Sequence, residues 1–545
     1  MAGFLQKGTR NILSKQPHDI VFLSALRTPV TRSKKGGFKD AYDHELLASV
    51  LKATLAANPN LDPKLINDIQ IGTVLSELGG SKAGRMAACH VGYPETVAFQ
   101  TVNRACSSGL AAITGIANAV AVGQIDIGVG GGMESMTKNY GSRAIPTQLW
   151  DRLRESEVKD ARDCIMSMGL TAENVAERYG VSRAEQDAFA ANSHIKAAKA
   201  QKEGLFDKEI VPVTTRWHPN PEAPEVQEEI TVTKDDGIRP NSSPESLAKM
   251  KPAFKETGTA TAGNSSQVSD GAAAALMMRR STANELGLSS SIIGKWAGTQ
   301  VVGCKPDEMG IGPALAIPKL LDYTGVSKDE IGIWEINEAF ASQAVYCVRE
   351  LGIDEAKVNP KGGAIALGHP LGATGARQLA TLLPEMERQG QELGVVSMCI
   401  GTGMFAMAFA LRSECLLTVP LRYGYGELDR PRVRLAQPMH RGDMSLHGEV
   451  KCLLLLYHCT NVQVFVRCLV RAMRLQVVLH LVLLLTFLPR LLRKKLVKVA
   501  AAAFALPLLR LVCHFLDLPR WLSLLPYAAS KMLMTGISFF IINIW

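Results

Sequence analysis

The cysteines of this chain lack the spacing of a metal site. Eleven cysteines occur in 545 residues, and no two of them have the CxxC spacing that is typical of zinc sites. Residues 1–412 can build a sizeable core without disulfides, and we expect no secretory signal before this body. We therefore expect free thiols in a reducing compartment and no bound metal. Six of the eleven cysteines lie in residues 1–412, namely Cys89, Cys106, Cys164, Cys304, Cys347 and Cys399.

A hydrophobic run long enough to span a bilayer is also missing. The longest run, residues 475–488, contains Gln476 and His480 and falls short of the roughly 18–20 residues that a membrane helix needs. It lies in a tail, residues 413–545, in which Leu, Val and Arg dominate. We expect this tail to be neither a folded domain nor membrane-associated. A basic segment that lies on a membrane surface is the alternative.

An excess of basic charge is missing outside that tail. The tail carries 17 Lys or Arg against 6 Asp or Glu, whereas residues 1–412 carry 43 against 45. Nothing in this near-neutral body indicates a nucleic-acid surface. Residues 1–18 contain three basic residues and no acidic one, so they are an N-terminal extension that resembles a short targeting segment.

Strand-like and helix-like segments alternate from residue 19 to about residue 412. This order is typical of βαβ units in a mostly parallel sheet with both faces covered. A more polar stretch, about residues 135–265, interrupts the order and indicates an inserted loop domain that grips a substrate. Apolar runs predict strands at residues 20–23, 69–72, 125–130, 292–297, 331–336 and 394–399, and helical periodicity predicts helices at residues 44–57, 110–122, 313–323 and 373–388.

Two cysteines lie in segments that favour an accessible thiol. Cys106 precedes a predicted helix, and the unpaired N–H groups and dipole at a helix N-terminus would lower its pKa. Cys399 ends an apolar strand, and the glycines that follow it, Gly401 and Gly403, form a turn whose N–H groups could receive an oxyanion. The alternative for Cys106 is a cysteine near a helix N-cap that takes no part in chemistry. The alternative for Cys399 is a buried cysteine at the end of a strand.

Three further segments could complete a thiol-dependent site. Residues 359–375 place five glycines around His369, whose neutral imidazole can take a proton from a thiol. Asn337 follows a predicted strand and could hold a water or bind an oxyanion. Residues 258–266 form a small polar loop suited to a nucleotide-like ligand, without a Walker or Rossmann pattern. The alternatives are a histidine satisfied inside a tight turn and, for the other two segments, ordinary surface turns.

These motifs, in this order, resemble the thiolase family over about residues 19–412. The resemblance implies an α/β thiolase fold, in which two similar βαβαβαββ halves pack as a five-layer α-β-α-β-α sandwich with an inserted loop domain. The halves would be residues 19–280, including the loop domain, and residues 281–412. The motifs that carry the resemblance are Asn103-Arg104-x-Cys106-Ser107-Ser108-Gly109, Asn337-Glu338-Ala339-Phe340, Gly368-His369-Pro370 and Cys399-Ile400-Gly401.

Within this family the chain is most similar to the degradative branch of peroxisomal type. Ser167 stands where short-chain biosynthetic thiolases carry a histidine. The resemblance implies thiolytic cleavage of 3-ketoacyl-CoA by CoA to acetyl-CoA and a shortened acyl-CoA in fatty-acid β-oxidation, through an acyl-cysteine. A biosynthetic acetoacetyl-CoA thiolase and a non-catalytic acyl-CoA- or lipid-binding protein on the same fold are the alternatives.

The resemblance also implies partners and a compartment. Coenzyme A would be a substrate, and no cofactor would be bound permanently. We expect a homodimer in the peroxisome, with the mitochondrial matrix as the alternative compartment.

The same resemblance implies roles for individual residues. Cys106 would accept the acyl group, with His369 as its base, and His369 with a water held by Asn337 would form one oxyanion hole. Cys399 would protonate the departing acetyl-CoA enolate. The backbone N–H groups of Cys106 and Gly401 would form a second oxyanion hole. The residues implied in binding are Ser266, which would touch the pantetheine of coenzyme A, and the pocket walls Met168, Ala339 and Phe340.

Overall fold

The computed structural model describes residues 7–140, 145–146, 148–220 and 225–411, with the backbone course alone for residues 404–411. All of them belong to the first of two units into which the chain divides, Met1–Arg422. The expectation that residues 413–545 are not a folded domain, and do not associate with membranes, lies outside the described residues.

The first half of the fold contains a sheet with the strand order β4-β3-β5-β8-β1. β3 runs parallel to both β4 and β5, whereas β8 is antiparallel to β5 and to β1. A short strand, β2 (Thr31–Arg32), pairs with β8. The long strands are β1 (Ile20–Arg27), β3 (Asp68–Gly72), β4 (Ala98–Val102), β5 (Ile127–Ser135) and β8 (Ser269–Arg279).

The second half repeats this arrangement, with the order β10-β11-β12-β9. β10 is parallel to β11, and β12 is antiparallel to β11 and β9. A parallel bridge between Trp334 and Val358 stands where the first half has β4. β1 and β9 pair over three residues and join the halves into one ten-stranded sheet. The strands are β9 (Gly294–Gly303), β10 (Ile333–Ile336), β11 (Leu393–Ile400) and β12 (Met404–Leu411).

The expectation of a mostly parallel sheet is wrong, because the last strand of each half runs against its neighbours. In the second half, the three-residue 3₁₀ turn Gly401–Gly403 reverses the chain between β11 and β12. A turn this short can only join antiparallel strands. In the first half, β8 follows β5 after a long insertion and also runs antiparallel to it.

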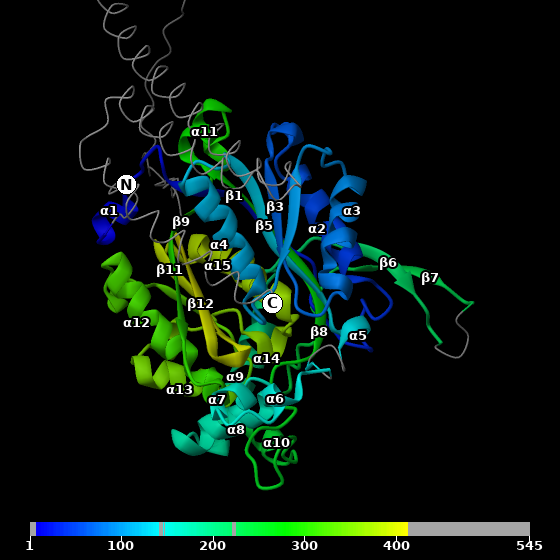
Figure 1. The fold of residues 1–545 in the computed structure, drawn as a ribbon, viewed down its shortest axis with the longest axis vertical. Coiled ribbons are helices and arrows are strands. Elements are labelled where there is room, and N and C mark those ends of the chain that lie inside the picture. The colour runs from blue at the N-terminus through cyan, green and yellow to red at the C-terminus, as the bar shows by residue number, and fades with distance from the viewer. Residues whose placement is uncertain (1–6, 141–144, 147, 221–224, 412–545) are drawn as a thin grey trace, which may run out of the picture. The chain divides into compact units, whose positions relative to one another are not determined.

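Six helices complete five layers, as the family resemblance implies. α2 and α3 cover one side of the first half, and α12 and α13 cover the far side of the second half. α4 and α15 pack against each other between the strands of the two halves (Figure 1). The helices are α2 (Asp43–Ala56), α3 (Ser81–His90), α4 (Ser108–Ala121), α12 (Gly312–Thr324), α13 (Ala341–Leu351) and α15 (Thr374–Gln389).

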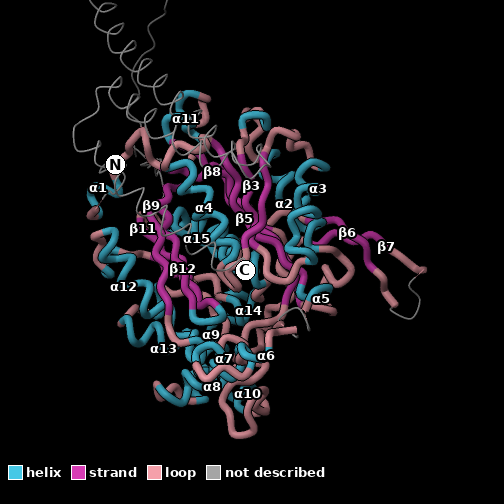
Figure 2. Tube along the Cα trace, viewed as in Figure 1, coloured by secondary structure: helices cyan, strands magenta, loops and turns pink. Residues whose placement is uncertain are grey.

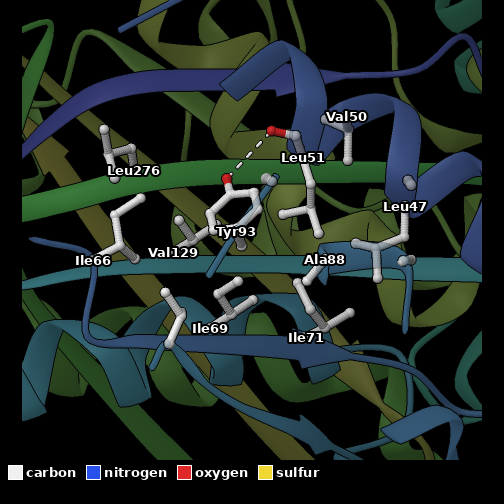
Figure 3. Packing of buried hydrophobic residues seen from close by; sticks show 14 of the residues in the cluster. Leu47, Val50, Leu51, Ile66, Ile69, Ile71, Ala88, Tyr93, Val129 and Leu276 are labelled. Atoms are coloured by element: carbon white, nitrogen blue, oxygen red, sulfur yellow. Dashed lines mark hydrogen bonds between the residues drawn. The ribbon is translucent and has the colours of Figure 1, made fainter. Parts of the chain in front are cut away.

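Three hydrophobic cores fill the layers: one on the outer side of each half, and one around the central helices that reaches both sets of strands. Figure 3 shows the outer core of the first half, where Leu47 and Leu51 of α2 pack over Ile69 and Val129 of the sheet. In the central layer, α4 is buried on nearly all sides, because sheets and a second helix surround it. Its alanine- and isoleucine-rich sequence suits this position, since small apolar side chains allow close packing on every face.

The insertion between β5 and β8 forms helices beside α13 and a two-stranded hairpin. α8 and α9 pack on α13, and the hairpin β6–β7 projects away from the large sheet (Figure 2). Within the part of the chain that the structure describes, no helix is long and apolar enough to cross a membrane. The elements of the insertion are α5 (Met136–Asn139), α6 (Asp151–Arg154), α7 (Lys159–Asp163), α8 (Met168–Arg178), α9 (Arg183–Lys202), β6 (Val213–Trp217), β7 (Glu228–Val232) and α10 (Pro244–Ala248).

The N-terminal segment is docked on the second half. In α1 (Thr9–Leu13) the side chain of Ile12 is only 1 % exposed and joins the core beneath α12. The amine of Lys295 donates to the carbonyl of Ile12 at 2.7 Å, and the N–H of Gly8 donates to the carbonyl of Thr324 at 2.7 Å. The remaining short helices are α11 (Arg280–Glu285) and α14 (Ala364–Leu367).

Candidate active site

Cys106 lies in a tight turn between β4 and α4. Ala105 adopts a left-handed backbone with φ of 43°, a conformation that costs energy for a residue with a Cβ. Hydrogen bonds hold this turn, because the hydroxyl of Ser108 accepts from the N–H of Arg104 at 2.8 Å and donates to the carbonyl of Ala105 at 2.6 Å. The strained turn therefore places Cys106 two residues before the start of α4, next to its N-cap residue Ser107.

The Cys106 thiol is neither exposed nor acidic, contrary to the expectation from the sequence. Cys106 is 9 % exposed, and burial raises the pKa of its thiol to about 11. The backbone N–H groups of Gly401 and of Cys106 itself hydrogen-bond the sulfur and pull the pKa in the opposite direction, but desolvation is the larger effect. In the resting protein Cys106 is therefore a thiol and needs a base.

His369 is available as that base, because it stays neutral. Burial, together with the charge of Arg377, lowers the pKa of His369 to about 3. Its Nδ1 lies 2.7 Å from the hydroxyl oxygen of Thr374, and that hydroxyl donates to the carbonyl of Pro370 at 3.2 Å. This pattern assigns the imidazole proton to Nδ1. Nε2 is left with a lone pair that can accept a proton.

Asn337 links the histidine to the strand that carries Cys399. Its Nδ2 lies 3.5 Å from Nε2 of His369, and its N–H donates to the carbonyl of Ser397 at 2.8 Å. The Oδ1 of Asn337 is buried and has no hydrogen-bond partner among the described residues. A buried amide oxygen without a protein partner is the kind of group that binds an ordered water.

Cys399 is more deeply buried than Cys106. Its side chain is 0 % exposed, and burial, with the charge of Cys106 as the next cause, holds its pKa well above the usual value. Its Sγ lies 3.9 Å from Oε1 of Gln343, which also accepts from the N–H of Phe340 at 3.2 Å. The expectation of an exposed second thiol is wrong, because β11 is covered on both faces. A protonated thiol is nevertheless the form that can donate a proton.

The residues expected to perform catalysis lie in one site, built from both halves. Gly401 reaches Cys106 with its N–H, and a Cβ placed on Gly401 would lie 3.7 Å from the Cβ of Ala105. The loop of His369 touches the first turn of α4, since a Cβ on Gly109 would lie 2.6 Å from the carbonyl oxygen of Gly372. Cys106, Gly401, Cys399, Asn337 and His369 thus converge from four separate segments.

The residues expected to contact coenzyme A lie near Gly401 or in and beside the segment that follows Asn337. Met168 begins α8, and its Sδ would lie 3.7 Å from a Cβ on Gly401. The N–H of Ser266 donates to the carbonyl of Ala339 at 3.0 Å, which places the Ser266 loop against the segment that follows Asn337. Phe340 is buried and meets the ring of Phe254 edge-on, at 5.8 Å between centroids. Among the described residues, no group of three or more His, Cys, Asp or Glu could hold a metal ion.

Three residues that contact the site were not singled out from the sequence. Thr374 fixes the tautomer of His369, Gln343 lies against Cys399, and Glu134 binds the loop of His369. Thr374 lies inside the glycine-rich segment, five residues after His369, and this closeness in sequence could have indicated a contact with the imidazole. The other two lie in an ordinary helix and strand, where nothing local distinguishes them.

The resting state of Cys106 can be tested by alkylation. We expect the rate of alkylation by iodoacetamide to rise about tenfold per pH unit from about pH 7 to about pH 9, because the thiolate fraction rises that way well below the pKa. The measurement is a pH series with mass mapping of the modified cysteine, and Cys106→Ala serves as the control, since Cys89 is exposed. An alkylation rate that reaches a plateau near pH 7 would show instead that the helix N-terminus lowers the pKa of Cys106 more than burial raises it.

Known proteins are similar to this chain in sequence and in fold. A family model for the thiolase N-terminal domain matches residues 20–281, and one for the thiolase C-terminal domain matches residues 290–412. The peroxisomal 3-ketoacyl-CoA thiolase of Yarrowia lipolytica is 50 % identical over 405 residues, which are 74 % of this chain and 96 % of that protein.

Solved structures agree with these matches. The crystal structure of the dimeric peroxisomal thiolase of Saccharomyces cerevisiae is 45 % identical, with a TM-score of 0.68, over 74 % of this chain and 100 % of that one. A second structure of the Saccharomyces cerevisiae 3-ketoacyl-CoA thiolase, described as five-layered with two core domains of identical topology, is 41 % identical with a TM-score of 0.59, over 74 % and 100 % of the two chains. The chain therefore belongs to the thiolase family.

Proposed function

We propose that this chain uses Cys106, His369 and Cys399 to cleave 3-ketoacyl-CoA with coenzyme A, producing acetyl-CoA and an acyl-CoA shortened by two carbons. It is a 3-ketoacyl-CoA thiolase (acetyl-CoA C-acyltransferase) of fatty-acid β-oxidation. The observation that carries the assignment of roles is the convergence of two buried thiols and a neutral imidazole from both halves of the fold. Coenzyme A is a substrate in this family.

The first step forms the acyl-enzyme. The Sγ of Cys106 attacks the C3 ketone of the substrate, while Nε2 of His369 takes the thiol proton. Because burial raises the pKa of the thiol and lowers that of the imidazole, we expect this proton to move together with formation of the sulfur–carbon bond. The new oxyanion is stabilised by the protonated Nε2 and by a water held on Oδ1 of Asn337.

The second step breaks the C2–C3 bond. The electron pair leaves with the acetyl-CoA enolate, and the thiol of Cys399 donates its proton to C2. The acyl group stays on Cys106 as a thioester. The N–H groups of Cys106 and Gly401 are positioned to stabilise the thioester enolate oxygen, because both already point into the space beside the Cys106 sulfur.

The third step returns the enzyme to its resting state. Coenzyme A binds, its thiol gives a proton to the Cys399 thiolate, and its sulfur attacks the acyl carbon. The Cys106 sulfur leaves and recovers its proton from His369. The protons balance over the cycle, so no metal or redox group is required.

The residues near Gly401 and after Asn337 fit the remaining parts of the substrate. Ser266 is half-buried beside Ala339, at the edge of a loop of small residues where a slender pantetheine chain can pass. Met168, Ala339 and Phe340 offer apolar surface close to the reacting thiols.

Thiolysis assays decide between this function and its alternatives. Purified protein is expected to cleave medium- and long-chain 3-ketoacyl-CoA with a higher kcat/KM than acetoacetyl-CoA. A preference for acetoacetyl-CoA would favour the biosynthetic alternative. Binding of acyl-CoA without turnover would favour the non-catalytic lipid-binding alternative.

A homodimer is the assembly we propose, and β4 supports it. This strand pairs with β3 alone, and its residues are half-buried or exposed along the free edge of the sheet. An open edge can pair with the same strand of a second copy. Sedimentation equilibrium is expected to give twice the chain mass. A monomer at micromolar concentration would contradict the proposal.

The expected peroxisomal location is confirmed by the relatives, since those named above are peroxisomal enzymes.

A further inference from the structure

A buried carboxylate on β5 ties the two halves together behind the catalytic histidine. Glu134 is 0 % exposed, and each of its oxygens accepts two hydrogen bonds. Oε1 accepts from the N–H of Leu75 at 3.1 Å and from the hydroxyl of Thr73 at 3.3 Å. Oε2 accepts from the N–H of Val74 at 3.0 Å and from the N–H of Gly372 at 2.9 Å. The first three donors belong to the first half, whereas Gly372 belongs to the second.

Gly372 occupies a sensitive position in the histidine loop. It lies in the 3₁₀ turn Leu371–Ala373, between His369 and Thr374, the two ends of the hydrogen bond that sets the imidazole tautomer. A shift of this turn would therefore move the imidazole relative to Cys106.

Glycines allow the close approach that this hydrogen bond needs. A Cβ on Gly132 of β5 would lie 2.2 Å from the carbonyl oxygen of Gly372, and one on Gly109 of α4 would lie 2.6 Å from the same atom. A Cβ on Gly372 itself would lie 2.6 Å from the Cα of Thr73. The backbone of the Gly372 turn thus lies directly against the backbone of the first half. The carboxylate of Glu134 links the two by a hydrogen bond to the N–H of Gly372.

Glu134 is buried without a cationic partner in the part of the chain that the structure describes. No Lys or Arg of the described residues forms an ion pair with it, and burial raises its pKa to about 7. The hydrogen bonds from Gly372, Leu75 and Val74 act in the opposite direction, while the charge of Asp43 adds to the rise. Its own negative charge disfavours the thiolate of Cys106. Retaining such a charge beside a nucleophile requires a compensating benefit.

We propose that Glu134 is a positioning residue for thiolysis, whose carboxylate holds the Gly372 turn against the first half and thereby keeps His369 in reach of Cys106. This inference rests on the proposed roles of Cys106 and His369.

The substitution Glu134→Gln tests the acceptor capacity and the charge of the carboxylate. One end of the glutamine is an NH₂ group, which cannot accept from the donors that face it, so one pair of hydrogen bonds must be lost. We expect the single-turnover rate of Cys106 acylation by 3-ketoacyl-CoA to fall about 10- to 100-fold, with KM within about threefold, since small misplacements of a base have effects of this size. Alkylation of Cys106 should shift to lower pH, because a charge that opposed the thiolate is gone.

Glu134→Asp separates geometry from charge. The aspartate keeps the negative charge but is one methylene shorter, so it cannot reach Leu75 and Gly372 together. We expect acylation to slow as in Glu134→Gln, whereas the pH profile of alkylation stays where it is. This second variant also keeps the inference testable if the glutamine variant does not fold.

A matched control measures how much stability is lost when a buried, hydrogen-bonded carboxylate elsewhere in the fold is replaced by an amide. Glu173 on α8 likewise accepts hydrogen bonds with both oxygens, from the N–H groups of Thr259 and Ala260 at 2.9–3.0 Å and from the hydroxyl of Thr259 at 3.0 Å. Glu173→Gln is expected to lower the melting temperature without shifting the alkylation profile of Cys106. Acylation by the Glu134 variants that is within about twofold of the unmodified enzyme, or that slows no more than in Glu173→Gln, would overturn the inference.

Cys106→Ala, assayed in parallel, distinguishes this inference from the proposed function. If that variant still catalyses thiolysis, the proposed function fails. If it is inactive while both Glu134 variants acylate normally, only the positioning role fails.

Discussion

Replacement of Cys106 by alanine is expected to lower kcat for thiolysis by at least about 10³-fold, because the acyl group then has no nucleophile to receive it. The fold should survive. The side chain is small and lies in a turn that hydrogen bonds of its neighbours hold in place. Steady-state thiolysis of a medium-chain 3-ketoacyl-CoA, with the melting temperature of each variant, measures the effect.

The exposed cysteine of α3 provides the matched control. Cys89 is a free thiol at the surface, and Cys89→Ala should leave the activity within about twofold of the unmodified enzyme. Thiolysis by Cys106→Ala at a rate close to that of the control would show that this thiol does not carry the acyl group. Such a result would favour a non-catalytic protein, or an enzyme with another nucleophile, on the same fold.

Replacement of Cys399 by serine is expected to separate the two halves of the reaction. A serine hydroxyl is a far weaker acid than a thiol, so protonation of the enolate at C2 should slow about 10²- to 10⁴-fold. Acyl transfer between Cys106 and coenzyme A also uses this group, but only to move the proton of a thiol, which is far more acidic than a C–H bond, so this half-reaction should be retained better. The two rates are measured as thiolysis of 3-ketoacyl-CoA and as exchange of labelled coenzyme A with acyl-CoA.

The environment of Cys399 makes this variant informative. Serine matches the size of the thiol, and Oε1 of Gln343 offers the new hydroxyl an acceptor. The substitution therefore changes acidity more than packing. Equal losses in both assays would contradict the division of roles between Cys106 and Cys399.

The sequence predicted the parts of the site that depend on local chain geometry. Glycines beside His369 and after Cys399 indicated turns that bring backbone close to a ligand, and both turns are present. The resemblance to thiolases then implied which segments should meet. The predicted alternation of strands and helices likewise corresponds to elements of the structure, because short apolar runs and helical periodicity are local signals.

Properties set by the surroundings of a residue could not be predicted in the same way. The helix N-terminus next to Cys106 suggested a low pKa, but the central layer buries the thiol and desolvation outweighs the N–H groups. The direction of β12 depends on a three-residue turn, which periodicity does not report. Glu134 gave no signal, since its partner Gly372 lies in the other half of the fold.

The identity of the residue that carries the acyl group is tested most directly by trapping the intermediate. The enzyme is incubated with a 3-ketoacyl-CoA in the absence of free coenzyme A, quenched in acid, and mapped by peptide mass spectrometry. The account predicts the mass of the shortened acyl group on the peptide that contains Cys106 and on no peptide that contains Cys399. An acyl group on Cys399, or turnover without any acylated cysteine, would contradict it.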